Sequence, residues 1–569
     1  MTLEPTATEL LKEIYGTVPP VLADGIAELI STASASDSKT GKSQLWTERD
    51  VVLITYADQI RQDEMTPLAT LSSFLLDHKL QHLIDCVHLL PFCPYTSDDG
   101  FSVTDYLAVD PLSGTWGDIA ALGENFTLMF DLVLNHCSQQ HEWFQRYLSG
   151  DPEYAEYFID QNPSENLSEV VRPRSLPLLT AFESNTGTKH IWTTFSEDQV
   201  DLNYANPKVM LAMIRTLIEY ARRGARIIRL DAIAFLWKEP GTPCIHLRQT
   251  HAAVQLMRYI LDQVAPGTLV LTETNVPHDE NISYFGNGDD EAHMVYQFSL
   301  PPLLLDAIHS ADTSILRDWL KDLKPPTGST TFFNFTASHD GVGVRPLEGI
   351  VAPKRVERLA EIVCNHGGRV STRQQSDGSD SPYELNISYL DAVADRNQVS
   401  AAEHSRRFLA TQAVMLSIQG MPAIYFHSLV GTPNDQDGVV TSGQNRRINR
   451  HKYNRSELES ALENPHSLQR RVFDGYRRLL KVRSVQKAFH PAASMQVIDL
   501  PGDGRLAWIR QHGDHELAVL VNLADEPKII AATKIPHQLR YDQLAEEELE
   551  ANAPIELRPF QVRWLTSGK

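Results

Sequence analysis

The sequence is poor in cysteine and has no long hydrophobic run. Its five cysteines, among 569 residues, form no Cys-x-x-Cys pair, so no zinc or dithiol motif is present. We expect Cys86, Cys93, Cys137, Cys244 and Cys364 to be buried, inert thiols. No stretch of about 18 apolar residues exists for a membrane span. The acidic N-terminus lacks the basic-then-apolar pattern of a signal peptide, which favours a cytoplasmic protein.

Positive charge is also scarce. Lysine and arginine number 51 against 73 aspartates and glutamates, which gives a formal charge of −22. This balance disfavours nucleic acid and anionic membranes as partners, because both require a basic surface. Nucleotide-binding glycine motifs and His-Glu-x-x-His are absent as well. We therefore expect small-molecule substrates, and any phosphate among them would need a local basic pocket.

Eight nearly continuous apolar runs are separated, in several places, by amphipathic helical patterns. Such runs are typical of parallel strands that are buried on both faces. They cover residues 51–57, 85–92, 127–136, 226–235, 268–274, 294–300, 331–340 and 421–426. Helices are predicted over 209–224 and 406–420, the second ending at Gly420 as its C-cap. Eight strand–helix units predict an α/β fold, the (β/α)₈ TIM barrel.

The composition of the remaining segments predicts several units outside the barrel. Two intervals rich in Pro, Ser, Asp, Asn and Gly are too long for simple connections, and we interpret them as insertions after strands 3 and 7. Segments 505–510 and 515–523 predict an antiparallel β domain at the C-terminus. The predicted division is an N-terminal helical extension 1–47, a barrel of 48–136, 207–340 and 406–486, an inserted domain B 137–206, a second insertion 341–405, and a C-terminal β-sheet domain 487–569.

Charged groups stand at the ends of several apolar runs. Asp131, Asp231 and Glu273 are examples, and His339-Asp340 ends the seventh run. A buried carboxylate cluster is costly unless it is paired or functional. The carboxyl ends of barrel strands meet at one face of the barrel, so these groups predict an active site there.

Retaining cleavage of a glycosidic bond explains the carboxylates, since it needs two carboxyl groups about 5–5.5 Å apart. Arg229 lies two residues before Asp231, on the same face of the strand, and would keep Asp231 ionised as the nucleophile. Glu273 has no cation beside it in the sequence, so a raised pKa would suit it as acid/base. Asp340 would hold sugar hydroxyls and brace the cationic transition state.

Four segments, DLVLNH, RIIRLDAIAF, LTET and FTASHD, resemble in order and spacing the signature regions of glycoside hydrolase family 13, the α-amylase clan. The resemblance covers about residues 48–569 and implies a covalent glucosyl–Asp intermediate. It implies Asp231 as nucleophile, Glu273 as acid/base and Asp340 as transition-state stabiliser. It also implies that His136, Arg229 and His339 contact the glucosyl ring.

A finer resemblance is to the sucrose phosphorylase subfamily, carried by HLLPFCPYTSDDGFSVTDY, RPRSLP, TFSEDQVDLNY and NRRINRH. It implies that phosphate attacks the intermediate and that α-glucose 1-phosphate is released. The residues that match are Asp98 and Phe101 in the glucose pocket, Phe195 and Gln199 beside it, Arg446 on the sugar, and Arg174 on phosphate, with Arg172 nearby.

The loop after the seventh strand departs from that subfamily. Tyr383 and Asn386 match its acceptor and phosphate loop, but Asp380 and Glu384 replace the usual residues. The leading hypothesis is cleavage of sucrose or a close analogue. Glucosylglycerol, glucosylglycerate and sucrose 6′-phosphate stay open as alternatives, as does hydrolysis of a small α-glucoside. An acidic loop would repel a charged acceptor, which favours a neutral one such as fructose or glycerol.

Partners and cofactors follow from the same resemblance. We expect a small α-glucoside and inorganic phosphate as substrates, no further cofactor, and a monomer or homodimer. Amylases often bind calcium near the residue equivalent to Asn135, but sucrose phosphorylases do not need it, so no metal is predicted. A catalytically inactive relative is a further alternative, and the presence of Asp231, Glu273 and Asp340 disfavours it.

Overall fold

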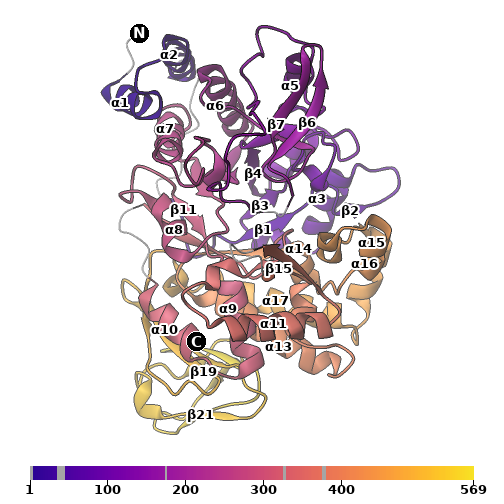
Figure 1. The fold of residues 1–569 in the computed structure, drawn as a ribbon. Coiled ribbons are helices and arrows are strands. Elements are labelled where there is room, and N and C mark those ends of the chain that lie inside the picture. The colour runs from indigo at the N-terminus through magenta and orange to yellow at the C-terminus, as the bar shows by residue number, and fades with distance from the viewer. Residues whose placement is uncertain (1–3, 35–44, 174–175, 324–328, 375–379, 569) are drawn as a thin grey trace.

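The eight predicted strands form one closed parallel barrel. This computed structural model describes residues 4–34, 45–173, 176–323, 329–374 and 380–568 (Figure 1). Around the barrel the strands follow chain order, and the last pairs with the first. They are β1 (Val52–Thr55), β3 (Cys86–Leu89), β4 (Thr127–Val133), β9 (Ala225–Asp231), β10 (Leu269–Thr272), β11 (Met294–Tyr296), β12 (Thr331–Asn334) and β16 (Met421–Tyr425). The TIM-barrel prediction is confirmed.

Helices with local start signals surround the barrel. At the start of α6, the Asn206 side chain accepts a hydrogen bond from the Lys208 amide, and Pro207 supplies a preset φ. The surrounding helices include α3 (Pro67–Asp77), α4 (Trp116–Gly123), α6 (Pro207–Arg222), α7 (Arg248–Val264), α9 (Leu300–Ser310), α10 (Ser314–Asp322), α13 (Ala401–Ser417) and α17 (Leu468–Arg483).

The predicted bounds of α13 are wrong at both ends. The helix begins five residues before 406, because the Ser400 side chain accepts a hydrogen bond from the Glu403 amide. It therefore crosses the predicted start of the last barrel segment. Its C-cap is Ile418 rather than Gly420. Gly420 has a φ of +132°, and a Cβ there would lie 2.8 Å from the Phe332 carbonyl oxygen, so its small size serves close packing against β12.

Two long segments rise from the barrel at the predicted insertions. After β4, strand β5 (His136–Ser138) pairs with β8 (Gln199–Asp201), and β6 (Leu179–Ser184) forms a hairpin with β7 (Gly187–Trp192). After β12, strands β13 (Val342–Gly343), β14 (Arg369–Gln374) and β15 (Asp380–Asn386) form a small sheet beside α11 (Pro353–Asn365). The exact domain boundaries stay predictions.

Both ends of the chain add structure outside the barrel. Helices α1 (Pro5–Tyr15) and α2 (Pro20–Ser34) lie against α6 and α7 (Figure 1). At the other end, an antiparallel sheet contains β18 (Ser494–Val497), β19 (Arg505–His512), β20 (His515–Asn522), β22 (Tyr541–Asp542), β23 (Glu547–Glu548) and β25 (Val562–Thr566). Its buried Arg510 donates a 2.9 Å hydrogen bond to the Ser417 carbonyl, which ties the sheet to the end of α13.

One prediction about the cysteines is wrong. Four are buried, but Cys364 is exposed near the end of α11, because it lies on the outer face of that helix. Among the helices that the structure describes, none has the length and hydropathy needed to cross a membrane.

Candidate active site

Arg229 is the electrostatic centre of the barrel mouth. β9 places it two residues before Asp231, and its Nη1 lies 2.6 Å from Asp231 Oδ1. The same nitrogen donates to Asp131, and Nη2 lies 3.8 Å from Glu273 Oε2. One buried guanidinium thus contacts carboxylates from three neighbouring strands. The sequence suggested no cation beside Glu273, and the barrel supplies one from the adjacent strand.

Burial is the largest influence on both candidate catalytic carboxyl groups. It raises the pKa of Glu273, and it raises that of Asp231 to about 8. Arg229 lowers the pKa of Asp231, as expected, but burial is the larger effect. The two carboxyls repel each other and titrate as a pair, which keeps one shared proton. Because Arg229 is closer to Asp231, the negative charge is better stabilised there and the proton belongs on Glu273.

Asp131, a third carboxylate on a barrel strand, has a lowered pKa instead of a raised one. Burial works against its ionisation, but Arg229 and His88 outweigh burial and lower its pKa to about 2. His88 Nε2 lies 2.7 Å from Asp131 Oδ2. Asp131 is therefore a permanent anion beneath the site, and it fixes the position of Arg229.

The backbone after β9 completes the geometry of Glu273. Ala232 has a φ of +51°, which is unusual for a residue other than glycine. Its amide donates a 3.0 Å hydrogen bond to Glu273 Oε2. Strained backbone of this kind is typical of functional sites.

Rings and neutral histidines form one wall. Phe101 stacks on His339 with 4.6 Å between ring centroids, and the Arg229 guanidinium lies 5.8 Å from the Phe101 ring. His136 Nε2 lies 3.1 Å from Gln199 Nε2, so those predicted residues are neighbours. Burial lowers the pKa of both His136 and His339, which keeps the two rings neutral.

Arg446 bridges two acidic residues of different loops. Its Nη1 lies 2.6 Å from Asp340 Oδ1, and its Nε and Nη2 donate to the two oxygens of Glu384 at 3.0 and 2.9 Å. Glu384 also accepts from the Gly341 amide at 2.7 Å and is 3% exposed. The carboxylate that was expected to face the acceptor is instead neutralised by Arg446.

A second arginine holds the turn that carries Asp98. Asp98 and Asp99 are both in the left-handed region, with φ of +51° and +50°. Arg450, fully buried, lies 3.1 Å from Asp98 and 2.8 Å from Asp99. The ion pairs offset the backbone strain and fix the orientation of Asp98 at the pocket.

Most predicted residues line one pocket at the barrel mouth. They are Asp98, Phe101, His136, Phe195, Gln199, Arg229, Asp231, Glu273, His339, Asp340, Tyr383 and Arg446. Asp380, Glu384 and Asn386 are not among the lining residues. Asp380 is exposed at the start of β15, and Asn386 is buried with its amide on Ser371 Oγ at 2.9 Å. Arg174 lies outside the described residues, although Pro173 lines the pocket. Arg172 is exposed.

Sequence reasoning missed several lining residues, of which Arg345 is the most informative. It follows β13 and lines the same pocket as Tyr383, with 12% of its side chain exposed. Its nearest acidic oxygen in the described chain is Glu348 Oε1, 3.9 Å from Nε, and that Nε has no hydrogen-bond partner among the described residues. No pattern in the sequence separated it from other loop arginines.

Comparison with known proteins agrees with this geometry. A family model described as the alpha-amylase catalytic domain matches residues 78–340. A glucosylglycerate phosphorylase of Allomeiothermus silvanus is 46% identical over 93% of this chain and 94% of its own length. The chain belongs to the α-amylase family, glycoside hydrolase family 13. It is an enzyme.

Two further relatives of this family 13 enzyme carry phosphorylase names. A sucrose phosphorylase of Agrobacterium vitis is 30% identical over 81% of this chain and 93% of its own. The crystal structure of sucrose 6F-phosphate phosphorylase from Thermoanaerobacter thermosaccharolyticum superposes with a TM-score of 0.73 at 24% identity, covering 85% of this chain and 96% of that one. The solved structure supports the fold.

In this family 13 enzyme, a lysine side chain lies beside Asn135. Lys238 Nζ lies 2.6 Å from Asn135 Oδ1 and 2.8 Å from Asp201 Oδ2, with 2% of its side chain exposed. Lys238 thus joins the loop after β9 to the loops around β5 and β8. A positive ammonium at Asn135 does not fit a calcium ion at the same oxygen. The expected absence of a metal stays a prediction.

Proposed function

We propose that the protein is a retaining glycoside phosphorylase that converts glucosylglycerate and phosphate to α-glucose 1-phosphate and glycerate. The observation that carries the proposal is the site itself, in which Asp231 and Glu273 both lie at the Arg229 guanidinium and burial raises the pKa of each. The choice of glycerate is supported by the 46% identity to a glucosylglycerate phosphorylase, against 30% to a sucrose phosphorylase.

In the first step, an oxygen of Asp231 attacks the anomeric carbon. Glu273 gives its proton to the glycosidic oxygen, the carbon–oxygen bond breaks, and glycerate leaves with an intact hydroxyl. Phe101, stacked on His339, presents an apolar ring at the site of the developing positive charge. Asp340, held by Arg446, faces the sugar from the opposite loop.

In the second step, a phosphate oxygen attacks the same carbon, its proton passes to Glu273, which is thereby restored as the acid, and Asp231 departs as a carboxylate. Two inversions give retention, so the product is the α anomer. Before it accepts that proton, Glu273 is anionic and would repel phosphate, so a cation must face the incoming anion. We assign this role to Arg345, and to Arg174 as the resemblance implies.

The same region must receive glycerate in one half-reaction and phosphate in the other. Both are anions, and Arg345 offers an Nε without a hydrogen-bond partner in the described chain. The preference for a neutral acceptor, inferred from an acidic loop, is not supported. Glu384 is paired with Arg446 and Asp380 lies away from the pocket, so neither carboxylate opposes an anionic acceptor.

A reverse-reaction screen tests the proposal. The enzyme receives α-glucose 1-phosphate with glycerate, fructose, glycerol or fructose 6-phosphate, and phosphate release is measured. We expect glycerate to give the highest kcat/KM. A higher value with fructose would return the assignment to sucrose phosphorylase. A rate of glucose release that does not change when phosphate is added would favour the α-glucoside hydrolase instead.

Arg345→Gln tests the anion site. A charge-assisted hydrogen bond contributes about 1.5–3 kcal/mol, so KM for glycerate and for phosphate should each rise about 10- to 100-fold. Arg373→Gln is the control, because Arg373 also pairs with Glu348, at 2.5 Å, but does not line the pocket. Equal effects of the two variants would remove Arg345 from the proposed site.

The remaining expectations belong to the same proposal. Inorganic phosphate acts as co-substrate with no further cofactor, the enzyme works in the cytoplasm, and it is a monomer or homodimer. Absence of a metal requirement is checked by dialysis against a chelator, which should leave activity unchanged.

A further inference from the structure

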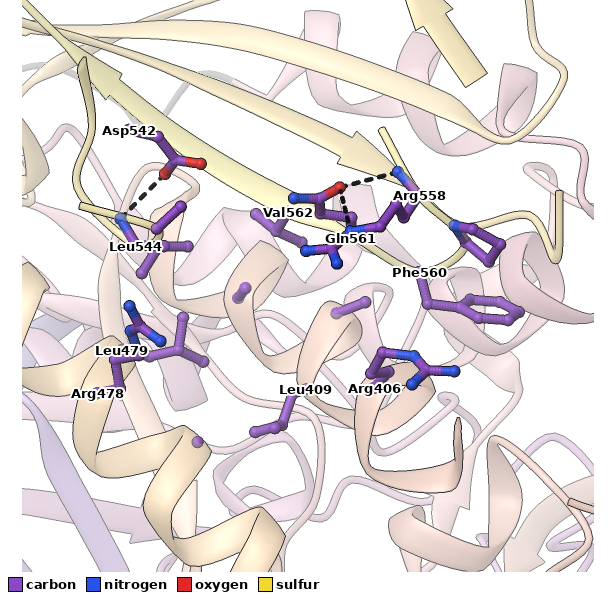
Figure 2. A pocket seen from close by; sticks show the side chains of 15 residues that line it. Arg406, Leu409, Arg478, Leu479, Asp542, Leu544, Arg558, Phe560, Gln561 and Val562 are labelled. Atoms are coloured by element: carbon purple, nitrogen blue, oxygen red, sulfur yellow. Dashed lines mark hydrogen bonds between the residues drawn. The ribbon is translucent and has the colours of Figure 1, made fainter. Parts of the chain in front are cut away.

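A second cavity lies away from the barrel mouth, between the barrel helices and the C-terminal sheet. Its volume is about 620 Å³, and it shares no lining residue with the active-site pocket. Helices α13 and α17 form one side, and β22, β25 and the turn before β25 form the other (Figure 2). Cavities of roughly 300–1,000 Å³ are the usual size of small-molecule sites.

The walls of this cavity are mainly apolar. Leu409 and Ala413 of α13 and Leu479 of α17 face Leu544, Phe560 and Val562 of the C-terminal domain. Such a surface gives no ordered contact to a small hydrophilic ion, but it stabilises an apolar body by removing it from water. The ligand must therefore be more than phosphate or glycerate.

Three arginines stand around the apolar walls: Arg406, Arg478 and Arg558. None of the three has an ion-pair partner within the described part of the chain. The backbone amide of Arg558 donates a 2.8 Å hydrogen bond to Gln561 Oε1, whereas its guanidinium makes only a long, 3.5 Å contact to the same oxygen (Figure 2). All three are exposed, so their guanidinium groups are accessible to a ligand.

Two other arginines of the same helices are paired with carboxylates. On α13, Arg407 lies 2.7 Å from Glu403, and on α17, Arg470 lies 2.5 Å from Asp474. The acidic residue that lines the cavity, Asp542, is 1% exposed and lies 2.8 Å from Arg563. Three unpaired guanidiniums therefore gather at one apolar cavity in a chain whose acidic residues outnumber its basic ones by 73 to 51.

We propose that this cavity binds a small organic anion with an apolar body, its negative charge stabilised by the guanidiniums of Arg406, Arg478 and Arg558 around the walls. Charge complementarity selects the anion, since guanidinium forks match carboxylate, sulfonate and phosphate oxygens. The apolar walls select the body. This cavity is separate from the active site, so the proposal does not depend on the identity of the acceptor.

Two fluorescent probes with the same body test the proposal. 8-Anilinonaphthalene-1-sulfonate carries an anionic group, and N-phenyl-1-naphthylamine lacks it. Titration of the intact enzyme should show that the sulfonate binds at least 10-fold more tightly than the neutral probe. Saturating α-glucose 1-phosphate should leave this binding unchanged, because the active-site pocket shares no residue with the cavity.

Substitutions of the lining residues test whether the probes bind in this cavity. The triple variant Arg406→Gln/Arg478→Gln/Arg558→Gln should weaken sulfonate binding at least 10-fold and leave the neutral probe unaffected. Arg471→Gln is the matched control, an exposed arginine of α17 that does not line the cavity. Ala545→Trp, at an exposed lining position, should block both probes.

Three results would overturn the proposal. They are equal affinities for the two probes, loss of sulfonate binding in Arg471→Gln as large as in the triple variant, and displacement by α-glucose 1-phosphate. Sedimentation supplies a fourth, since a dimer that dissociates in the triple variant would mean that a second copy of the chain covers the cavity. Thermal unfolding of every variant confirms that loss of binding is not loss of fold.

Discussion

The two cavities of this enzyme use arginine in opposite ways. At the barrel mouth, Arg229 and Arg450 are buried and Arg446 is partly buried, and all three are bound to carboxylates. At the C-terminal cavity, Arg406 and Arg478 have no such partner in the described chain and are exposed. A paired, buried arginine fixes the geometry of its partners, whereas an unpaired one is available to a ligand. Within the barrel mouth, Arg345 is intermediate, since its side chain is mostly buried and its nearest acidic oxygen, on Glu348, lies 3.9 Å from Nε.

The largest expected effect is at the paired site. Asp231→Asn removes the nucleophile, so turnover should fall by roughly 10⁴-fold or more. Steady-state phosphorolysis measures this, with circular dichroism to show that the fold persists. A variant that keeps a tenth of the activity would show that Asp231 is not the nucleophile.

Glu384→Gln removes the partner of Arg446 but keeps the size of the side chain. Arg446 would lose its bidentate contact and shift relative to Asp340, and a displacement of this kind can lower activity about 10²-fold. We expect kcat/KM to fall by that factor. Asp380→Asn, in the same strand but exposed, should change it less than about twofold. Equal effects would mean that the loop, rather than the ion pair, positions Asp340.

Lys238→Met leaves Asp201 buried without its cation. Breaking a buried pair costs about 3–5 kcal/mol, so the free energy of unfolding should fall by that amount in a urea titration. Lys189→Met breaks a pair with Asp160 in which both side chains are about one-third exposed, and should cost less than about 1 kcal/mol. Similar values for the two variants would contradict the buried role of Lys238.

The raised pKa of the Asp231–Glu273 pair gives a pH signature. Burial raises the pKa of both carboxyls, to about 8 for Asp231, so the pair contributes stability while protonated at low pH and loses it as pH rises from about 4 to 8. Asp231→Asn cannot ionise, so its Tm should gain on that of the wild type between about pH 4 and 8. The exposed variant Asp63→Asn serves as control. A constant difference would show that the pair is not buried as described.

The smallest effect is expected at the unpaired site. Arg478→Gln should change the free energy of unfolding by no more than about 0.5 kcal/mol, because it breaks no ion pair of the described chain. Arg450→Met, which leaves Asp98 and Asp99 without their buried cation, should cost about 3–5 kcal/mol. A large loss in Arg478→Gln would mean that this arginine is structural.

The features that could be predicted from the sequence are those that depend on residues close together in the chain. Continuous apolar runs located all eight barrel strands, and the charged residues at their ends located Asp231 and Glu273 at one pocket. The start of α13 was missed although Ser400 and Glu403 have the spacing of a capping signal. Gly420 was assigned a cap, but its reason is a close contact with β12, 88 residues earlier in the chain at Phe332.

Long-range ion pairs could not be read from the sequence. Arg446 meets Glu384 across 62 residues, and Lys238 meets Asn135 across 103. The sequence alone does not show which group pairs with each of these side chains, because the partners are far apart in the chain and are brought together only by the fold. Arg345 shows the reverse case, since its buried Nε without a hydrogen-bond partner in the described chain becomes evident only when the pocket is assembled. The inference of a neutral acceptor rested on the acidic loop alone, whereas Glu384 of that loop is paired with Arg446.

The most direct test of the account is identification of the covalent intermediate. Glu273→Gln is mixed with α-glucosyl fluoride, whose leaving group needs no acid, and the quenched protein is digested and examined by mass spectrometry. The account predicts one glucosyl group on the peptide that contains Asp231, lost on addition of phosphate with release of α-glucose 1-phosphate. A glucosyl group on another residue, or turnover without any adduct, would contradict it.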